Sequence, residues 1–522
     1  MGENSKSMSD NTSNNKRIAK NTLMLYIRML LIMGVTLFTS RVILQTLGVE
    51  DYGIYNVVGG VIAMFTFINS AMVTSTQRYI TFALGQNDFN RLKKVFSTSL
   101  QIHALISLII VVLGETIGLW FLYEKMIIPE PRIDAALWVY QASIVACVVS
   151  IMSVPYNAEI VAHERMSAFA YISILEALLK LLIVYLLYVI PFDKLKTYAI
   201  LVLVIQILIQ FVYSNYCNKH FKESKYAFVY DKPLLKEMTS FAGWSFWGSF
   251  SVLCCNQGVN LLLNTFFGPI VNAARGIAVT IQTAVGQFSS NFQMALNPQI
   301  IKTYAIGNID EHRKLLFTAC KFSSLLVMII SLPFLLETST VLNLWLGKVP
   351  EYTVNFVRII LIISIWDSTA YPLATSVQAT GRVKKYQVVI GTVILLIVPV
   401  SYALLYYFSI PELALVAHFV IAVLAQFVRL WFVRNLIQIS IRKFVTKVYL
   451  PLVPTFVLSL FATYFMFQGV ETTGLIRLLL VSAVAVMIAL ASSYIISLDF
   501  SERRFVRESV SKFIRTVRHK QN

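Results

Sequence analysis

The stretch GQNDFNRLKK, at residues 85–94, lies between two long apolar segments, and a similar stretch, GNIDEHRKLL, occupies residues 307–316. Both contain the spacing Gly-x-x-Asp-x-x-Arg, which ends at Arg91 in the first copy and at Arg313 in the second. Glycine permits a turn, aspartate can cap the following helix, and arginine can interact with lipid headgroups. The motif therefore indicates a turn between two helices and does not predict a binding site.

Two other short connections between apolar segments also resemble each other in sequence. The sequence AHER at residues 162–165 resembles ATGR at residues 379–382. Arg165 and Arg382 are separated by nearly the same length of chain as Arg91 and Arg313, which predicts a unit of six membrane spans that is used twice. Because six is even, both copies face the same way and are related by an axis along the membrane normal.

The composition is that of a polytopic membrane protein. Of 522 residues, 57% are hydrophobic and 13% are charged, and the mean hydropathy is +0.70. A soluble domain is roughly a quarter charged, and one helical span needs about 20 apolar residues. Fourteen apolar runs of that length are predicted, at 21–46, 54–84, 96–122, 135–160, 168–190, 197–217, 239–264, 270–300, 316–337, 354–380, 386–408, 412–434, 448–468 and 475–497.

The basic residues in the connections predict the orientation. Thirty Lys and Arg residues fall on the side of the N-terminal tail and 5 on the other side. Short cytoplasmic loops carry the excess of Lys and Arg, so both termini are expected in the cytoplasm. Attraction to anionic lipid explains the net charge of +18, and nucleic acid is not expected as a partner because no basic soluble domain is present.

These patterns predict an all-α fold with two six-helix lobes, related by a pseudo-two-fold axis along the membrane normal, and two additional C-terminal helices. The predicted parts are a cytoplasmic tail at 1–20, an N-lobe at 21–218, a cytoplasmic interlobe linker at 219–238, a C-lobe at 239–435, two further spans at 436–498 and a basic cytoplasmic tail at 499–522.

Arginines within the spans point to a polar space between helices. Nine basic residues fall inside apolar runs, and a deep one must face protein or a wet cavity. The second, seventh and eighth spans also carry stripes of polar residues with helical spacing. Lipid would not tolerate such polar faces, so they are expected to meet other helices or water. Hydrogen bonds between helices would also account for the amides. The residues predicted to form a cationic substrate-binding cavity are Arg28, Arg78, Arg275, Gln282, Asn256 and Asn260.

Three further charged residues lie near the membrane midplane. Glu176 and Lys180 on the fifth span are four residues apart and can pair with each other. Asp367 on the tenth span has no such local partner, and Pro372 follows to loosen its helix. Mutual pairing is a sufficient structural explanation for Glu176 and Lys180. Ionisable residues at this depth are nevertheless functional candidates by default, so all three are predicted as coupling groups or counter-ions of the cavity.

Cysteine and histidine patterns predict no disulfide framework, metal site or cofactor. The five cysteines lie in or beside apolar segments and form no Cys-x-x-Cys pair, and the six histidines show no spacing that is typical of metal ligands.

Four stretches carry a resemblance to a known family: TSRVILQTLGVEDYGIYNVVGGV (39–61), FFGPIVNAARGIAVTIQTAVGQFSSNFQMALNPQIIKTYAIGN (266–308), LNLWLGKVPEYT (342–353) and ATGRVKKYQ (379–387). They resemble bacterial Wzx-type oligosaccharide flippases, in the polysaccharide-transport branch of the MOP (multidrug, oligosaccharidyl-lipid, polysaccharide) exporter superfamily. The resemblance covers essentially the whole chain and implies a protein of the bacterial inner membrane. Its expected activity is the transfer of an undecaprenyl-diphosphate-linked oligosaccharide from the cytoplasmic to the periplasmic leaflet, by alternating access of the two lobes.

The same resemblance implies a role in surface polysaccharide (O-antigen or lipopolysaccharide) biosynthesis. It implies membrane lipids and the polysaccharide polymerase and chain-length machinery as partners. The family commonly has cationic cavities, but the cavity arginines match no shared motif and are assigned by charge and depth alone.

Two other classes remain as alternatives. A MATE-type exporter of cationic compounds would need carboxylates in its N-lobe cavity, whereas the first two spans carry Arg28, Arg41 and Arg78 and no acid. A membrane polymerase or glycosyltransferase would need a sizeable outer loop with acidic groups. The longest outer connection, 338–353, contains Glu351 as its only acidic residue, so the sequence does not favour an enzyme.

Overall fold

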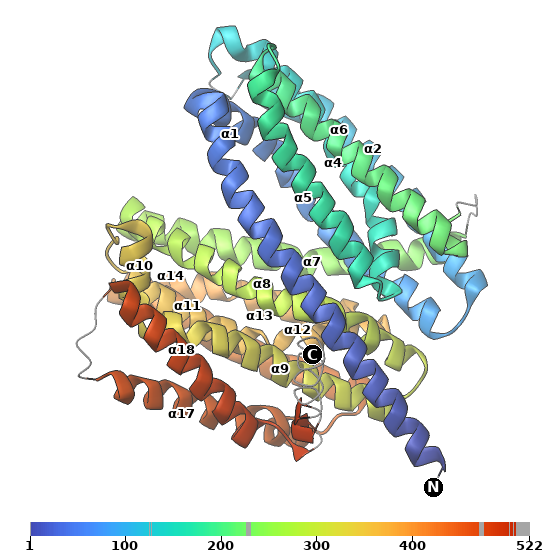
Figure 1. Cartoon of the computed structure of the whole chain (residues 1–522), viewed down its shortest axis with the longest axis vertical. Helices are drawn as coiled ribbons and strands as arrows, with labels where there is room; N and C mark the ends of the chain where they lie inside the picture. The colour runs from blue at the N-terminus through green and yellow to red at the C-terminus, as the bar shows by residue number, and fades with distance from the viewer. Residues whose placement is uncertain are drawn as a thin grey trace, which may run out of the picture.

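The structure is a computed structural model, and it describes residues 2–124, 126, 128–225, 231–468, 474–500, 502–504 and 506–507. Every regular element in these ranges is a helix, so the predicted all-α fold class is confirmed. Two bundles of helices make up the molecule, and a long N-terminal helix runs between them (Figure 1). The side chain of Arg41 and most of the expected C-terminal tail lie outside the described part of the chain.

The N-lobe begins with a helix that contains two of the predicted spans. Helix α1 (Gly2–Gly85) is bent at Gly48, where φ is 81° and ψ is 169°, so its two arms run in different directions. Its first arm also continues through the predicted tail at 1–20. The rest of the lobe comprises α2 (Phe89–Leu113), α3 (Leu119–Glu124), α4 (Ile133–Ala162), α5 (Met166–Val189) and α6 (Lys194–His220), with short π and 3-10 turns at Gly114–Gly118, Glu130–Arg132 and Lys222–Ser224.

The C-lobe starts at Lys232, so the connection between the lobes is shorter than the predicted linker at 219–238. Its helices are α7 (Lys232–Phe267), α8 (Pro269–Ala305), α9 (Ile309–Leu336), α10 (Thr338–Leu346), α11 (Thr353–Asp367), α12 (Ala370–Thr380), α13 (Lys384–Leu395), α14 (Ile397–Phe408) and α15 (Leu413–Ile437). The additional C-terminal part has α16 (Ile441–Phe444), α17 (Leu450–Phe467) and α18 (Gly474–Ser492), with π turns at Val445–Tyr449 and Ser493–Ser497. Helices α17 and α18 pack on the outside of the C-lobe near α9 (Figure 1).

Ten helical segments of the described chain are long and apolar enough to cross a membrane. Helices α7 and α8 have 36 and 37 residues but are not among these ten, and both carry polar stripes. With these two helices and the two arms of α1, the structure has helices at all fourteen predicted spans.

The turns of the two lobes repeat in their backbone conformation, as the sequence similarities predicted. Three pairs of residues with positive φ occupy matching turns: Gly48 and Gly268, Asn87 and Gly307, and Glu164 and Gly381. The two members of a pair are separated by nearly the same length of chain in all three cases. This agreement supports a six-span unit that is used twice.

The register of the repeated motif nevertheless differs from the sequence prediction. Asp88 caps α2 by accepting a hydrogen bond from the backbone N–H of Arg91, at 2.9 Å. In the second copy Asn308, and not Asp310, occupies the capping position and accepts from the N–H of Glu311. The pairing of Arg91 with Arg313 was therefore wrong by two positions, because the residues that cap the two helices, Asp88 and Asn308, stand at different places in the repeated motif.

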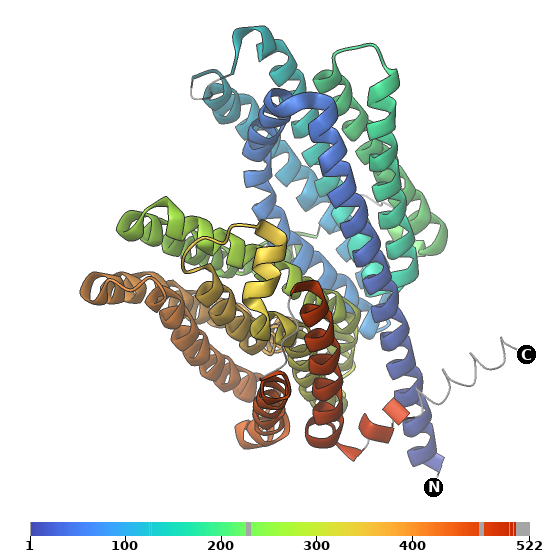
Figure 2. The same ribbon diagram turned by 60° about the vertical axis from the view of Figure 1, so that its left-hand side comes forward.

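The two lobes meet at one end of the molecule and diverge toward the other (Figures 1 and 2). We call the meeting end the basic end, because Lys and Arg are concentrated in and beside its turns at 85–88, 163–165, 306–308 and 381–383, for example at Lys93, Lys302 and Arg382. A shared apolar cluster joins the lobes there, and it includes Tyr79 and Phe96 of the N-lobe and Leu316, Leu373 and Val377 of the C-lobe. Closure at the basic end thus rests on packing as well as on polar contacts.

Candidate functional site

Glu164 joins the lobes at the basic end through two hydrogen bonds to its carboxylate. Its oxygens accept from Nε2 of Gln299 at 2.6 Å and Nζ of Lys302 at 2.8 Å, both on α8 of the C-lobe. The same carboxylate forms an ion pair with Nε of Arg17 on α1 at 2.8 Å. Glu164 is 6% exposed and has φ of 58°, so a turn with a left-handed residue directs it toward the C-lobe. We call Arg17, Glu164, Gln299 and Lys302 the interlobe clamp.

Arg78 makes a second connection between the lobes. Its Nε donates to the carbonyl of Gln378 at 3.2 Å and its Nη2 donates to the carbonyl of Ala379 at 3.1 Å, both in the last turn of α12. The C-terminus of a helix carries partial negative charge, so the guanidinium is well placed there. Gly381 follows with φ of 76°, and a Cβ at this position would lie 2.8 Å from Nη2 of Arg78.

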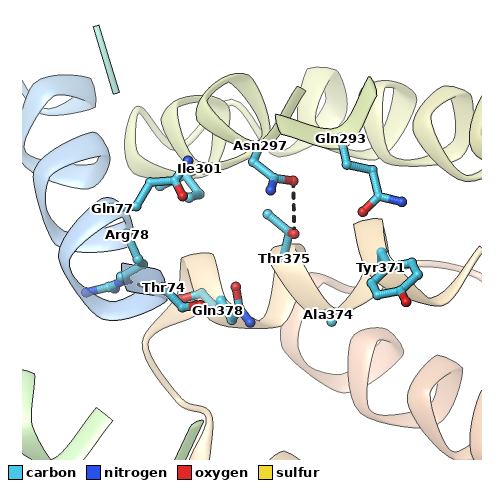
Figure 3. A pocket seen from close by; sticks show the side chains of 10 residues that line it. All are labelled: Thr74, Gln77, Arg78, Gln293, Asn297, Ile301, Tyr371, Ala374, Thr375 and Gln378. Carbon is cyan, nitrogen blue, oxygen red and sulfur yellow. Dashed lines mark hydrogen bonds between the residues drawn. The ribbon is translucent and has the colours of Figure 1, made fainter. Parts of the chain in front are cut away.

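A cavity of about 190 Å³ lies between the lobes beside Arg78 (Figure 3). Its polar lining consists of four amides (Gln77, Gln293, Asn297 and Gln378), two threonines (Thr74 and Thr375), Tyr371 and Arg78. Asn297 accepts a hydrogen bond from the hydroxyl of Thr375 at 3.1 Å, as Figure 3 shows. No carboxylate of the described chain lines the cavity, so the formal charge on this lining is positive.

Three other residues predicted for the cavity come together inside the C-lobe instead. Arg275 is 2% exposed, and its Nε donates to Oδ1 of Asn260 at 2.6 Å and its Nη2 to Oδ1 of Asn256 at 3.5 Å. Helices α7 and α8 form a hairpin around Gly268, which brings these residues side by side. Arg275 therefore lies in the packing between the two helices and not in the interlobe cavity. Gln282 lies two turns further along α8, is partly buried and does not line that cavity.

A second cavity, of about 410 Å³, lies within the N-lobe and contains the remaining predicted cationic residue. Arg28 lines it together with Glu176 and Lys180, and the guanidinium of Arg28 stacks on Phe169 at 4.5 Å. Lys180 Nζ lies 2.7 Å from Oε1 of Glu176, as the spacing of four residues predicted. The three charged groups share one cavity, but it is separate from the one between the lobes.

Asp367 is the last residue of α11, at the break where the tenth span divides into α11 and α12. Arg429 on α15 is the charged group of the described chain that acts electrostatically on its carboxylate. This cation belongs to the same lobe as Asp367 and is not one of the predicted cavity arginines. Pro372 lies in the first turn of α12, in agreement with the expected interruption of this span.

The clamp residues were missed by sequence reasoning, although one signal was available. Glu164 follows His163 in a short connection, where an acidic residue among basic neighbours is unusual. Its partner Lys302 is 138 residues away, and only the packing of α8 against the N-lobe brings the two together.

No protein-family model matches the sequence, and no curated protein matches it. Among solved structures, an outward-facing multidrug resistance MATE family transporter of the MOP superfamily matches with a TM-score of 0.70 at 13% identity, over 81% of this chain and 96% of that chain. A MATE structure in the straight conformation matches with a TM-score of 0.70 at 14% identity, over 81% of this chain and 96% of that one. A MOP superfamily transporter from Pyrococcus furiosus Vc1 matches with a TM-score of 0.68 at 13% identity, again over 81% and 96%.

The chain has the same fold as these MATE structures. The predicted arrangement of two six-helix lobes is thereby confirmed. Within this chain, the two arms of α1 and the helices α7 and α8 have matching places in the two halves. A glycine with positive φ separates the members of each pair, at Gly48 and Gly268.

Proposed function

We propose that this protein is a flippase that moves a lipid-linked oligosaccharide, with an anionic diphosphate linkage such as that of undecaprenyl diphosphate, across a bacterial inner membrane. The observation that carries the proposal is the lining of the interlobe cavity, which has Arg78, four amides and no carboxylate of the described chain. The activity would serve the synthesis of a surface polysaccharide. No covalent chemistry is required of the protein.

The charge of the cavity favours an anionic substrate over a cationic one. Two unit charges about 4 Å apart interact by roughly 4 kcal/mol at the dielectric of a partly wet site. The positive charge of one arginine therefore favours an anionic substrate over a cationic one by a large factor in affinity. A guanidinium offers a planar fork that matches a phosphate group. Amide side chains both donate and accept hydrogen bonds, which suits the hydroxyl groups of a sugar.

One of the structural neighbours supports the same distinction. The MOP superfamily transporter from Pyrococcus furiosus is described by a binding pocket of reverse polarity that suggests a different function. The cavity of this chain has a positive charge from Arg78 and, among the described residues, no negative one. A MATE-type exporter of cationic compounds is the second candidate, and the overall fold favours it as much as the flippase.

The way the lobes meet supports a mechanism of alternating access. The basic end is closed by the interlobe clamp and by Arg78, and the lobes diverge at the other end (Figure 1). Because Lys and Arg accumulate on the cytoplasmic side, this arrangement corresponds to a state that is open to the outside. Loading from the cytoplasmic leaflet then requires that the clamp and the Arg78 contacts break.

The test is deletion of the gene in its native bacterium, followed by analysis of the lipid-linked glycans. We expect an undecaprenyl-linked oligosaccharide to accumulate on the cytoplasmic side, and the intact gene to reverse this. Arg78→Ala should fail to restore export, and Arg78→Lys should restore part of it. Arg382→Ala is the matched control, since Arg382 is an exposed arginine at the same end of the molecule.

Two outcomes would overturn the proposal. Unchanged glycan lipids combined with increased retention of cationic dyes would establish the exporter. Glycosyl transfer by the purified protein in detergent, where no membrane separates two compartments, would instead establish an enzyme.

A further inference from the structure

Two carboxylates and an imidazole meet at the basic end of the N-lobe, outside both cavities. Glu159 lies in the last turn of α4, His163 follows directly after this helix, and Glu223 lies in the short turn after α6. One potential ligand atom from each residue lies within 4.8 Å of the others. Glu159 is fully buried and Glu223 is 6% exposed, so these acids do not belong to a solvated surface.

The contacts inside the cluster leave one buried oxygen without a partner. His163 Nε2 lies 2.7 Å from Oε1 of Glu223, and the hydroxyl of Ser224 donates to Oε2 of Glu159 at 2.8 Å. Oε1 of Glu159 is buried and accepts no hydrogen bond from any residue that the structure describes. The ring of Phe221 stacks on His163 at 4.1 Å and 11°, which fixes the direction of the imidazole.

A buried, unpaired carboxylate oxygen is costly, and a second carboxylate beside it adds repulsion. A divalent cation removes both costs, because it supplies the missing partner and neutralises the two charges. Metal sites with three protein ligands from histidine and carboxylates keep one position open for water. The side chain of His163 is 23% exposed, which gives an ion a path from solvent.

We propose that Glu159, His163 and Glu223 form a binding site for a divalent transition-metal ion, with Zn²⁺ as the best fit. The imidazole nitrogen selects against Mg²⁺ and Ca²⁺, which prefer sites made of oxygen ligands alone. Binding requires only small movements of the side chains, since the ligand atoms already converge.

The position of the site gives it a mechanical consequence. The metal joins the end of α4 to the turn at Lys222–Ser224, which leads into the connection between the lobes. His163 is also the neighbour of Glu164, whose carboxylate forms the centre of the interlobe clamp. An ion on His163 therefore holds the turn from which Glu164 reaches α8, and it stabilises the closed basic end. This assignment is independent of the transported substrate.

The experiment uses the purified full-length protein in detergent after treatment with a chelator. Zn²⁺ is titrated by calorimetry, the metal content is measured after dialysis, and thermal unfolding is followed with and without Zn²⁺. We expect one Zn²⁺ per chain and a higher melting temperature when it is bound. His163→Ala and the nearly isosteric Glu223→Gln should each weaken binding on the order of tenfold or more.

His220→Ala is the matched control, because His220 is an exposed histidine at the same end that lies outside the cluster. It should bind Zn²⁺ like the parent protein. Melting curves of the metal-free variants show whether each variant still folds, so that a loss of Zn²⁺ binding can be distinguished from a loss of the fold. Co²⁺ gives a second readout, since its visible absorption reports direct nitrogen and oxygen ligation.

Three results would overturn the proposal: no Zn²⁺ retained by the parent protein, equal affinity in the parent and in both variants, or displacement of Zn²⁺ by equimolar Mg²⁺. A parent protein that binds no metal but changes its melting temperature with pH, in a manner that Glu159→Gln abolishes, would show that the two carboxylates share a proton instead.

Discussion

The carboxylate of Glu164 in the N-lobe accepts a hydrogen bond from the amine of Lys302 in the C-lobe at 2.8 Å. The side chain of Glu164 is 2% exposed and that of Lys302 is 23% exposed, so water screens this pair far less than a surface ion pair. Gln299 donates to the same carboxylate and Arg17 forms an ion pair with it, so one residue of a short turn contacts both α8 and α1. The closed basic end therefore depends on a small number of polar contacts over a shared apolar cluster.

Replacing Glu164 with Gln should open the basic end. A hydrogen bond to a charged group contributes about 1.5–3 kcal/mol, so the population of the open state should rise roughly tenfold to a hundredfold. The measurement is the distance between spin labels at K93C and K314C, two exposed positions in different lobes. Labelling requires a background without the five native cysteines.

Asp310→Asn is the control for this experiment, because the side chain of Asp310 is 88% exposed at the same end. It should leave the distance distribution unchanged. An unchanged distribution in Glu164→Gln as well would show that the apolar cluster alone keeps the lobes together.

Gly381→Ala should disrupt the contacts of Arg78 with α12. The added methyl group would lie 2.8 Å from Nη2 of Arg78, and alanine is also strained at φ of 76°. Gly347→Ala is the matched control, because Gly347 has φ of 73° and no atom within 4 Å of its Cβ position. We expect Gly381→Ala to lose export to the same degree as Arg78→Ala and the double variant to lose no more. Additive losses in glycan export would contradict a shared contact.

Asn260→Ala should lower the stability of the C-lobe. It leaves Nε of the buried Arg275 without its acceptor, which typically costs about 1–3 kcal/mol. Asn264→Ala, one turn further along α7 at an exposed position, should have no such effect. Thermal unfolding in detergent measures both variants. If both variants melted at the temperature of the parent protein and only Asn260→Ala lost export, Arg275 and its two amide partners would instead have a role in substrate binding.

Arg132 makes the stability of the N-lobe depend on pH at the end opposite the basic end. It donates to Asp193 at 2.5 Å and to Asp51 at 2.7 Å. Burial alone would raise the pKa of Asp193, but hydrogen bonds from the N–H of Lys196 and from Arg132 outweigh it and hold this pKa below its ordinary value of 3.8. The lowered pKa in the folded state stabilises the fold above pH 3.8, and this contribution is lost as the pH falls through the folded value.

The melting temperature of the parent protein should therefore fall more steeply on acidification than that of Asp193→Asn. The difference should be largest near neutral pH and should vanish at the lowest pH values. Glu351→Gln, at an exposed position outside this cluster, should follow the parent curve. Parallel curves for the parent and Asp193→Asn would refute the assignment.

Asp367→Asn should fold but export poorly, because it leaves Arg429 without the carboxylate that acts on it. The second substitution Arg429→Gln removes the remaining charge, so the double variant should recover part of the export lost in Asp367→Asn. Membrane abundance and glycan export measure the two effects separately. Parent-like export by Asp367→Asn across pH would show that this carboxylate has no mechanistic role.

Much of the architecture was readable from the sequence because local rules fix it. Apolar runs of spanning length predicted helices at all fourteen positions, and two similar connections predicted the repeat. The pairing of Glu176 with Lys180 followed from their spacing of four residues, since neighbouring turns of one helix bring such side chains together. The register of the repeated motif was predicted less well, because Gly85 matched Gly307 in identity but not in conformation.

Which residues come together in each site is determined by the tertiary structure alone. Arg28, Arg78 and Arg275 looked alike as basic residues in apolar helices, yet they lie in three different surroundings. Glu159 and His163 are four residues apart, but the third member of their cluster, Glu223, is 60 residues away from His163. A helix determines which residues share a face, whereas the packing of helices determines what that face meets, and contacts between distant parts of the chain leave no periodic pattern in the sequence.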